Sequence, residues 1–186
     1  MKQLIPLALL AFSLTAAAAD GVNLVKNPGF EEDGSWTIWG THKHFGDEDK
    51  ATLMTIVAAG DTPEGKRYLK SADTWEDGRP YIVQFIEMPQ VAKSYVMKFK
   101  AKAPENTGFR AGVMYNKGTL GDPKTYAFVG NRIPVFTGTG EWKEYTVKLD
   151  NINAGTNVFA VVLAPSTAEK TDTNTVLFDD ISLVAE

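Results

Sequence analysis

The sequence predicts an all-β fold of two packed antiparallel sheets, and two observations carry this prediction. Apolar residues recur at every second position over most of the chain, as on strands with one buried face. Clusters of Gly, Pro, Asn and Asp interrupt these runs at short intervals, and no window shows a sustained helical period. About ten short strands separated by turns are expected to form a two-sheet antiparallel β-sandwich.

The expected strands share the two-residue period and are bounded by turn residues. In chain order they are residues 51–58, 67–74, 81–88, 94–103, 108–116, 126–136, 142–150, 158–163 and 174–184. Residues 94–103 show the clearest alternation, with Tyr95, Met97 and Phe99 on one face and lysines on the other. Residues 158–163 are apolar at every position, which is typical of a strand covered on both faces.

The first nineteen residues resemble a secretory signal peptide rather than part of the fold. Lys2 gives a small positive start, an apolar run covers residues 4–14, and four alanines at 16–19 offer a cleavage site. We therefore expect a secreted product, extracellular or periplasmic, in which residues 20–186 form one domain. The apolar run is too short for a membrane anchor, and the sequence shows no repeat, no low-complexity linker and no later apolar run of membrane-spanning length.

Composition favours a neutral ligand. The formal net charge is −4 and no stripe of Lys and Arg is present, which argues against binding to nucleic acid or to an anionic membrane. Four Trp and six Tyr supply flat rings of the kind that stack on the apolar face of a sugar. The chain has no cysteine, so an exported fold must close without disulfides, and a bound metal is one alternative.

Four segments, in order, resemble the carbohydrate-binding modules of families four, nine and twenty-two. They are Asn-Leu-Val-Lys-Asn-Pro-Gly-Phe-Glu at 23–31, Tyr-Val-Met-Lys-Phe-Lys-Ala-Lys-Ala at 95–103, Glu-Trp-Lys-Glu-Tyr-Thr-Val at 141–147 and Phe-Asp-Asp-Ile-Ser-Leu at 178–183. The resemblance implies a galactose-binding-like jelly roll that holds polysaccharide, β-glucan or xylan-like, in an aromatic-lined groove. It also implies a monomer without catalytic activity, whose partner could be a separately encoded glycoside hydrolase.

The resemblance further implies a structural calcium ion near the chain ends, held by Glu31 and Asp179. Glu31 follows the tight turn Asn27-Pro28-Gly29, and Asp179 shares strand parity with Ile181, so its carboxylate is expected to point inward. A buried carboxylate normally needs a cation or several hydrogen-bond donors, and calcium takes oxygen ligands. The alternative is that both carboxylates pair with lysine or backbone N–H groups.

Six residues are predicted to contact the ligand. Trp75 lies in a polar segment, Tyr81 and Tyr126 begin strands beside polar loops, and Gln84 is an amide that could bind sugar hydroxyls. Tyr115 has core parity but ends its strand, and Arg110 lies on the outward face. The other tryptophans, Trp36, Trp39 and Trp142, are interpreted as packing residues.

Two other functions stay open. A jelly roll can host a glycoside hydrolase or a polysaccharide lyase, although Glu87 has no acidic neighbour two residues away and the two histidines, His42 and His44, share one loop. The same sandwich with an unused groove could be a structural or adhesin-like protein, and the apolar strand around Phe159 favours that reading slightly.

Overall fold

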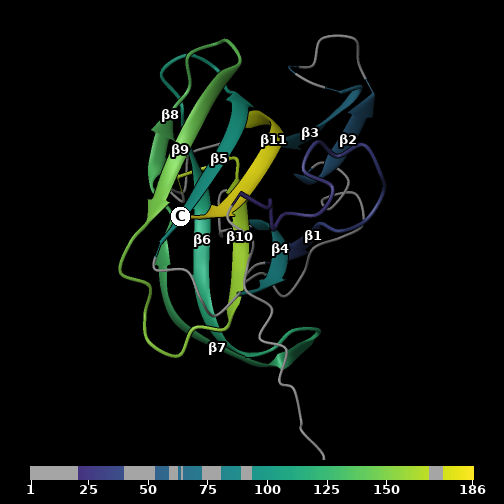
Figure 1. Ribbon diagram of the computed structural model, residues 1–186. Helices are drawn as coiled ribbons and strands as arrows, with labels where there is room; N and C mark the ends of the chain where they lie inside the picture. The colour runs from purple at the N-terminus through teal and green to yellow at the C-terminus, as the bar shows by residue number, and fades with distance from the viewer. Residues whose placement is uncertain are drawn as a thin grey trace, which may run out of the picture.

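The computed structural model describes residues 21–39, 53–58, 63, 65–72, 81–88, 94–167 and 174–186. These residues form eleven β-strands in two antiparallel sheets, which confirms the predicted fold class (Figure 1). Across the described ranges, no helix has the length and apolarity needed to cross a membrane. The predicted signal peptide, residues 1–19, lies outside the described residues.

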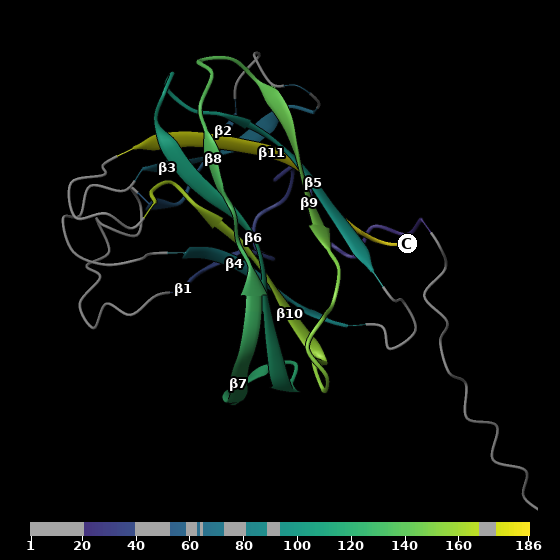
Figure 2. The ribbon, with the colours of Figure 1, turned by 90° about the vertical axis from the view of Figure 1, so that its left-hand side faces the viewer.

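One sheet has six strands and supplies the candidate binding face. Its order is β1 (Thr37–Trp39), β4 (Tyr81–Glu87), β10 (Val158–Ala164), β6 (Gly108–Thr119) and β7 (Asp122–Arg132), with β8 (Val135–Thr137) also paired to β6. Neighbours in this sheet are mostly distant in sequence, as in a jelly roll. Figure 2 shows the β6–β7 hairpin at one end of the molecule.

The second sheet has five strands and contains both the clearest predicted strand and the last one. Its order is β2 (Thr55–Ala58), β3 (Arg67–Ala72), β11 (Thr175–Ala185), β5 (Tyr95–Lys102) and β9 (Lys143–Leu149). Asn23 to Pro28 run alongside β11: the Leu183 N–H donates to Asn23 Oδ1 at 2.9 Å and the Ile181 N–H donates to the Pro28 carbonyl at 3.0 Å. The first described segment is thereby fastened to the last strand.

The core lies between the sheets and is rich in aromatic rings. The predicted alternation on β5 is confirmed, since Tyr95, Met97 and Phe99 are all fully buried. The Phe99 ring stacks on Tyr145 with centroids 5.5 Å apart, and Phe109 meets Phe178 edge-on at 5.9 Å. Offset and edge-on ring pairs add to the stabilisation from burial itself.

Strand boundaries differ from the prediction around one proline. Residues 126–136 were expected as one strand, but β7 ends at Arg132 and β8 begins at Val135. Pro134 has no N–H to donate to a ladder, so the pairing with β6 is interrupted there. Residues 132 and 133 instead pack directly over Gly112, where an added Cβ would come within 2.1 Å of the Arg132 carbonyl oxygen.

Candidate functional site

The six-stranded sheet has a core-facing side and an outer face, and the strand register separates them. On β10, Phe159, Val161 and Leu163 belong to the hydrophobic core, so Val158 and the alternate residues of the strand face outward. Residues paired across the strands share a face. The outer face therefore includes the paired rows Glu87, Val158, Asn116 and Phe128, and Phe85, Ala160, Met114 and Asn131.

Four aromatic residues gather on this outer face, and we call them the aromatic strip: Trp39, Phe85, Tyr126 and Phe128. The Trp39 and Phe85 rings lie 5.0 Å apart, and the Phe85 and Tyr126 rings lie 4.7 Å apart. Trp39 is 39% exposed and Phe128 is 60% exposed, so both present ring surface to solvent. The strip thus runs from β1, at one edge of the sheet, to β7 near the other.

Small residues under the strip let its rings meet. Phe85 on β4 and Tyr126 on β7 are separated in the sheet by β10 and β6, so their side chains lean toward each other over those two strands. The outward residues of β10 beneath them are short: Val158, Ala160 and Val162 are almost fully buried although they face away from the core. The ring contact therefore covers part of the sheet and shapes the outer face.

The tyrosine of the strip is held from two directions. Its ring lies against Gly118, where an added Cβ would come within 2.8 Å of Tyr126 Cδ1. Its hydroxyl oxygen accepts a hydrogen bond from the Gly121 N–H at 3.1 Å. Both contacts come from the β6–β7 hairpin, so the hairpin positions the ring against Phe85.

Among the residues that the structure describes, few charged side chains share the face of the strip. The described strands bring two acidic residues to this face: Glu87 on β4 and Asp122 at the hairpin turn. Asn131 supplies an amide and Arg110 a half-buried cation at the opposite end. An apolar ring surface with a few polar groups at its border suits a neutral, hydroxyl-rich ligand.

The structure places two of the six predicted ligand residues beside or within the strip. Tyr126 belongs to it, and Tyr81 lies on the outer face of β4 opposite Trp39. Arg110 also lies on this face, paired with Ala164 and Val135, but away from Tyr126. Trp75 lies outside the described residues.

Gln84 and Tyr115 face the core side of the six-stranded sheet. Gln84 faces the core side and is 3% exposed, and its amide accepts from the Lys26 N–H at 2.7 Å and donates to the Lys26 carbonyl at 2.8 Å. Tyr115 is buried against Phe159 with centroids 5.8 Å apart, and burial raises the pKa of its phenol. Neither side chain reaches the outer face.

Three residues of the strip were not proposed from the sequence. Trp39 was interpreted as a core or edge packing residue; it lies on the edge strand β1 and packs on Phe85, yet it also presents ring surface to solvent. Trp36 is buried, as predicted, and its Nε1 donates to the Asn27 carbonyl at 3.2 Å. Phe85 shares strand parity with Tyr81, and this parity could have predicted from the sequence that Phe85 lies on the same face as Tyr81. Phe128 shares parity with Tyr126 in the same way.

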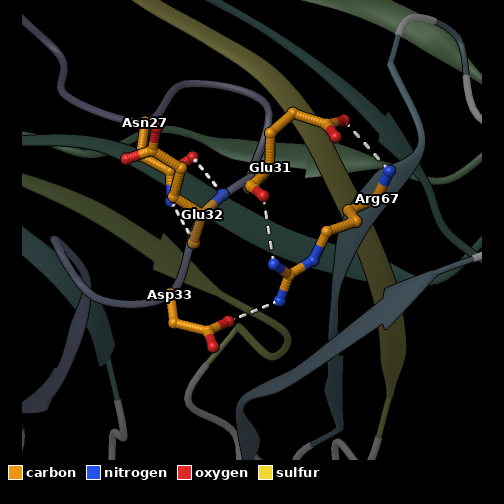
Figure 3. A network of polar contacts seen from close by, with 5 residues as sticks. All are labelled: Asn27, Glu31, Glu32, Asp33 and Arg67. Carbon is orange, nitrogen blue, oxygen red and sulfur yellow. Dashed lines mark hydrogen bonds and ion pairs between the residues drawn. The ribbon is translucent and has the colours of Figure 1, made fainter.

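The side chains of the two predicted metal ligands both pass beside Gly29, and the Glu31 carboxylate then turns toward the backbone of residues 65–67. An added Cβ on Gly29 would lie 3.5 Å from Asp179 Oδ1 and 3.8 Å from Glu31 Cγ. Glu31 Oε1 accepts a hydrogen bond from the backbone N–H of Lys66 at 2.6 Å. It accepts a second from the backbone N–H of Arg67 at 3.0 Å (Figure 3). These two donors hold the pKa of the Glu31 carboxyl below its usual value.

Asp179 is fully buried, as expected, but strand parity does not explain its burial. The register between β11 and β5 shifts between Asp179 and Ser182, and Asp180 has a φ of 50°. This bulge breaks the alternation that was used to place Asp179 with Ile181. Asp179 Oδ1 accepts from the Asp180 N–H at 2.8 Å. Within the described residues, no three His, Cys, Asp or Glu side chains form a metal-binding group.

Comparison with known proteins shows a carbohydrate-binding-module-like jelly-roll fold. No family model matches the sequence, and no curated protein matches it. Among solved structures, TmCBM61 in complex with β-1,4-galactotriose has a TM-score of 0.57 and 19% identity over 89% of this chain and 100% of that chain. The CBM22-1 xylan-binding domain of Paenibacillus barcinonensis Xyn10C has a TM-score of 0.53 and 14% identity over 91% of this chain and 97% of that chain.

The same fold also occurs within larger enzymes. The arabinose-bound α-L-arabinofuranosidase MgGH51 matches with a TM-score of 0.54 and 12% identity, covering 91% of this chain but 27% of that chain. At these identities the matches establish the fold alone. Function must be argued from the site.

Proposed function

We propose that this protein is a non-catalytic carbohydrate-binding protein whose aromatic strip holds a neutral polysaccharide, of the β-glucan or xylan type. The observation that carries the proposal is the continuous ring surface from Trp39 through Phe85 to Tyr126, with Phe128 exposed beside it. The fold shared with sugar-binding modules is consistent with this use.

The physical basis is the two-sided chemistry of a sugar ring. Its C–H face is apolar and is desolvated favourably on an aromatic ring, while its hydroxyls need hydrogen-bond partners at the border. Trp39 and Phe128 offer exposed ring area, and Tyr81, Asn131 and Glu87 offer polar groups on the same face by register. A chain lying along the strip would contact several rings at once, so its affinity would accumulate over successive sugar units.

The absence of catalysis is proposed from the residues around the strip. Glycoside hydrolysis commonly uses a pair of carboxylates that flank the scissile bond. On the described strands, Glu87 has no acidic partner across β10, since its row continues with Val158 and Asn116. This arrangement supports a face that holds a polysaccharide and leaves it intact.

Affinity electrophoresis through gels that contain xylan, β-glucan, mannan or pectin tests this function. We expect xylan or β-glucan to retard the protein, and we expect no release of reducing ends from the retarding polysaccharide. Unretarded migration in all four gels would contradict polysaccharide binding. Retardation accompanied by reducing-end release would contradict the non-catalytic assignment.

We also propose a structural calcium ion held by Glu31 and Asp179. Both side chains carry hard oxygen ligands, the type that calcium prefers, and both pass beside Gly29, since Asp179 Oδ1 and Glu31 Cγ lie near that position. Because the described residues provide no third acidic or histidine ligand, backbone carbonyls and water would complete the coordination. The ion would fasten the first described segment to β11 and so reinforce the backbone bonds already present there.

Thermal unfolding with and without calcium tests this ion. At a free calcium concentration of about one hundred times the dissociation constant, binding to the folded state alone adds about 2.7 kcal/mol, which raises the melting temperature by roughly 5–10 °C. Asp179→Asn should remove this increment, whereas Asp180→Asn, whose side chain pairs with Lys100, should keep it. An equal melting temperature for the wild type in calcium and in EDTA would contradict the proposal.

A further inference from the structure

We propose that Asn157 is a positioning residue for the aromatic strip: its side chain holds the β6–β7 hairpin so that Tyr126 lies against Phe85 before any ligand arrives. The inference rests on the proposed function, because it concerns how that binding face is built. Asn157 itself lies in the connection between β9 and β10 and not in the strip.

The Asn157 side-chain amide forms hydrogen bonds with both the N–H and the C=O of Gly118. Its Oδ1 accepts from the Gly118 N–H at 2.9 Å, and its Nδ2 donates to the Gly118 carbonyl at 2.8 Å. The Asn157 backbone is fixed as well, since its N–H donates to the Asn116 carbonyl at 3.0 Å and its carbonyl accepts from the Met88 N–H at 2.9 Å. The side chain is therefore presented to the hairpin from a fixed base.

Gly118 needs this partner because the neighbouring strand on that side does not reach it. β10 begins at Val158, which pairs with Asn116, so the β10–β6 ladder ends before Gly118. Backbone N–H and C=O groups that lose their ladder partners must find others. The Asn157 amide has the same donor and acceptor as a peptide group and takes the place of the missing strand partner.

Gly118 in turn fixes the position of the Tyr126 ring. Its φ is 148°, and an added Cβ would lie 2.8 Å from Tyr126 Cδ1 and 2.9 Å from the Thr125 carbonyl oxygen. The Tyr126 ring therefore lies directly on the glycine backbone that Asn157 holds. A shift of Gly118 would move this ring relative to Phe85, whose centroid is 4.7 Å away.

A second asparagine of the same connection supports the other strand of the hairpin. Asn153 Nδ2 donates to the Val129 carbonyl, and the Asn153 side chain packs against Gly130. The two asparagines thus hold β6 and β7 at neighbouring positions. Because the hairpin is already ordered, the binding free energy does not include the cost of ordering it, and such preorganisation increases affinity.

Asn157→Asp tests the proposal because its effect depends on pH. The Asp carboxylate can accept from the Gly118 N–H, but its second oxygen then faces the Gly118 carbonyl, and two acceptors repel each other. At pH 7 we expect binding of the retarding polysaccharide to weaken about tenfold, the effect of roughly 1.4 kcal/mol. At a pH low enough to protonate this carboxyl, its O–H can donate to the carbonyl, and affinity should return toward that of the wild type.

The matched control is Asn151→Asp, an exposed asparagine of the same connection, together with the wild type at both pH values. Asn157→Ala should weaken binding at both pH values, because alanine offers neither group. Wild-type affinity of Asn157→Asp at pH 7, or a loss that acidification does not reverse, would overturn the positioning role.

Amide hydrogen exchange separates this inference from the proposed function. Asn157→Asp at pH 7 should speed exchange at Gly118 and Gly121, with the β5 and β11 amides unchanged. If the wild type binds no polysaccharide, the proposed function fails while this exchange result still decides whether Asn157 holds the hairpin. Unchanged exchange at Gly118 would overturn the inference.

Discussion

Replacing Trp39 and Phe128 together with alanine should abolish retardation by polysaccharide while leaving the fold intact. These are the two most exposed rings of the aromatic strip, so their removal takes away contact area without opening the core. Truncating an aromatic residue at the centre of a binding site costs about 2 kcal/mol or more. Each substitution should therefore weaken binding more than tenfold, and the pair roughly a hundredfold or more.

The control for this double variant is Trp142→Ala, which removes the same type of side chain from the far side of the molecule. Trp142 precedes β9 of the five-stranded sheet and packs edge-on against Tyr68, with centroids 6.0 Å apart. It should leave retardation unchanged. Unaltered mobility of the double variant, or lost retardation in Trp142→Ala at a preserved fold, would place the ligand somewhere other than the strip.

Replacing Gln84 with alanine should lower stability and leave the intrinsic affinity for polysaccharide unchanged. The Gln84 amide makes two hydrogen bonds to the Lys26 backbone, and its removal leaves a partly buried N–H and C=O without their partner. The expected loss is about 2–3 kcal/mol, which corresponds to a melting temperature lower by roughly 4–12 °C for a domain of this size.

Glu87→Ala is the matched control, because Glu87 lies on the same strand but is exposed. It should change the melting temperature little. A Gln84→Ala variant with the wild-type melting temperature but without polysaccharide binding would return Gln84 to the list of ligand contacts, as first predicted from the sequence.

The fold class could be predicted because alternation of apolar residues is a local property. Tyr95, Met97 and Phe99 show it without reference to any other part of the chain, and all three are buried. The all-apolar run at residues 158–163 was likewise read as a strand covered on both faces, and Val158 and Phe159 are both buried in β10.

The binding face could be predicted only in part, because it depends on which strands become neighbours. Phe85 and Tyr126 are far apart in sequence, and their rings meet over β10 and β6, where the outward side chains of β10 are short. The residues next to Gln84 in sequence do not indicate that its amide will bond the Lys26 backbone. The burial of Asp179 was expected, but the register pairs it with Lys100 and a bulge after it breaks its parity with Ile181; single-residue shifts of this kind are invisible to a two-residue period.

Hydroxyl-radical footprinting, read by mass spectrometry, tests most directly whether ligand lies on these rings. The protein would be labelled alone, with the polysaccharide that retards it, and with one that does not. We predict that the retarding polysaccharide protects Trp39 and Phe128 from oxidation and leaves Trp142 unprotected. Equal labelling of Trp39 and Phe128 under all three conditions, or protection centred on Trp142, would contradict the account.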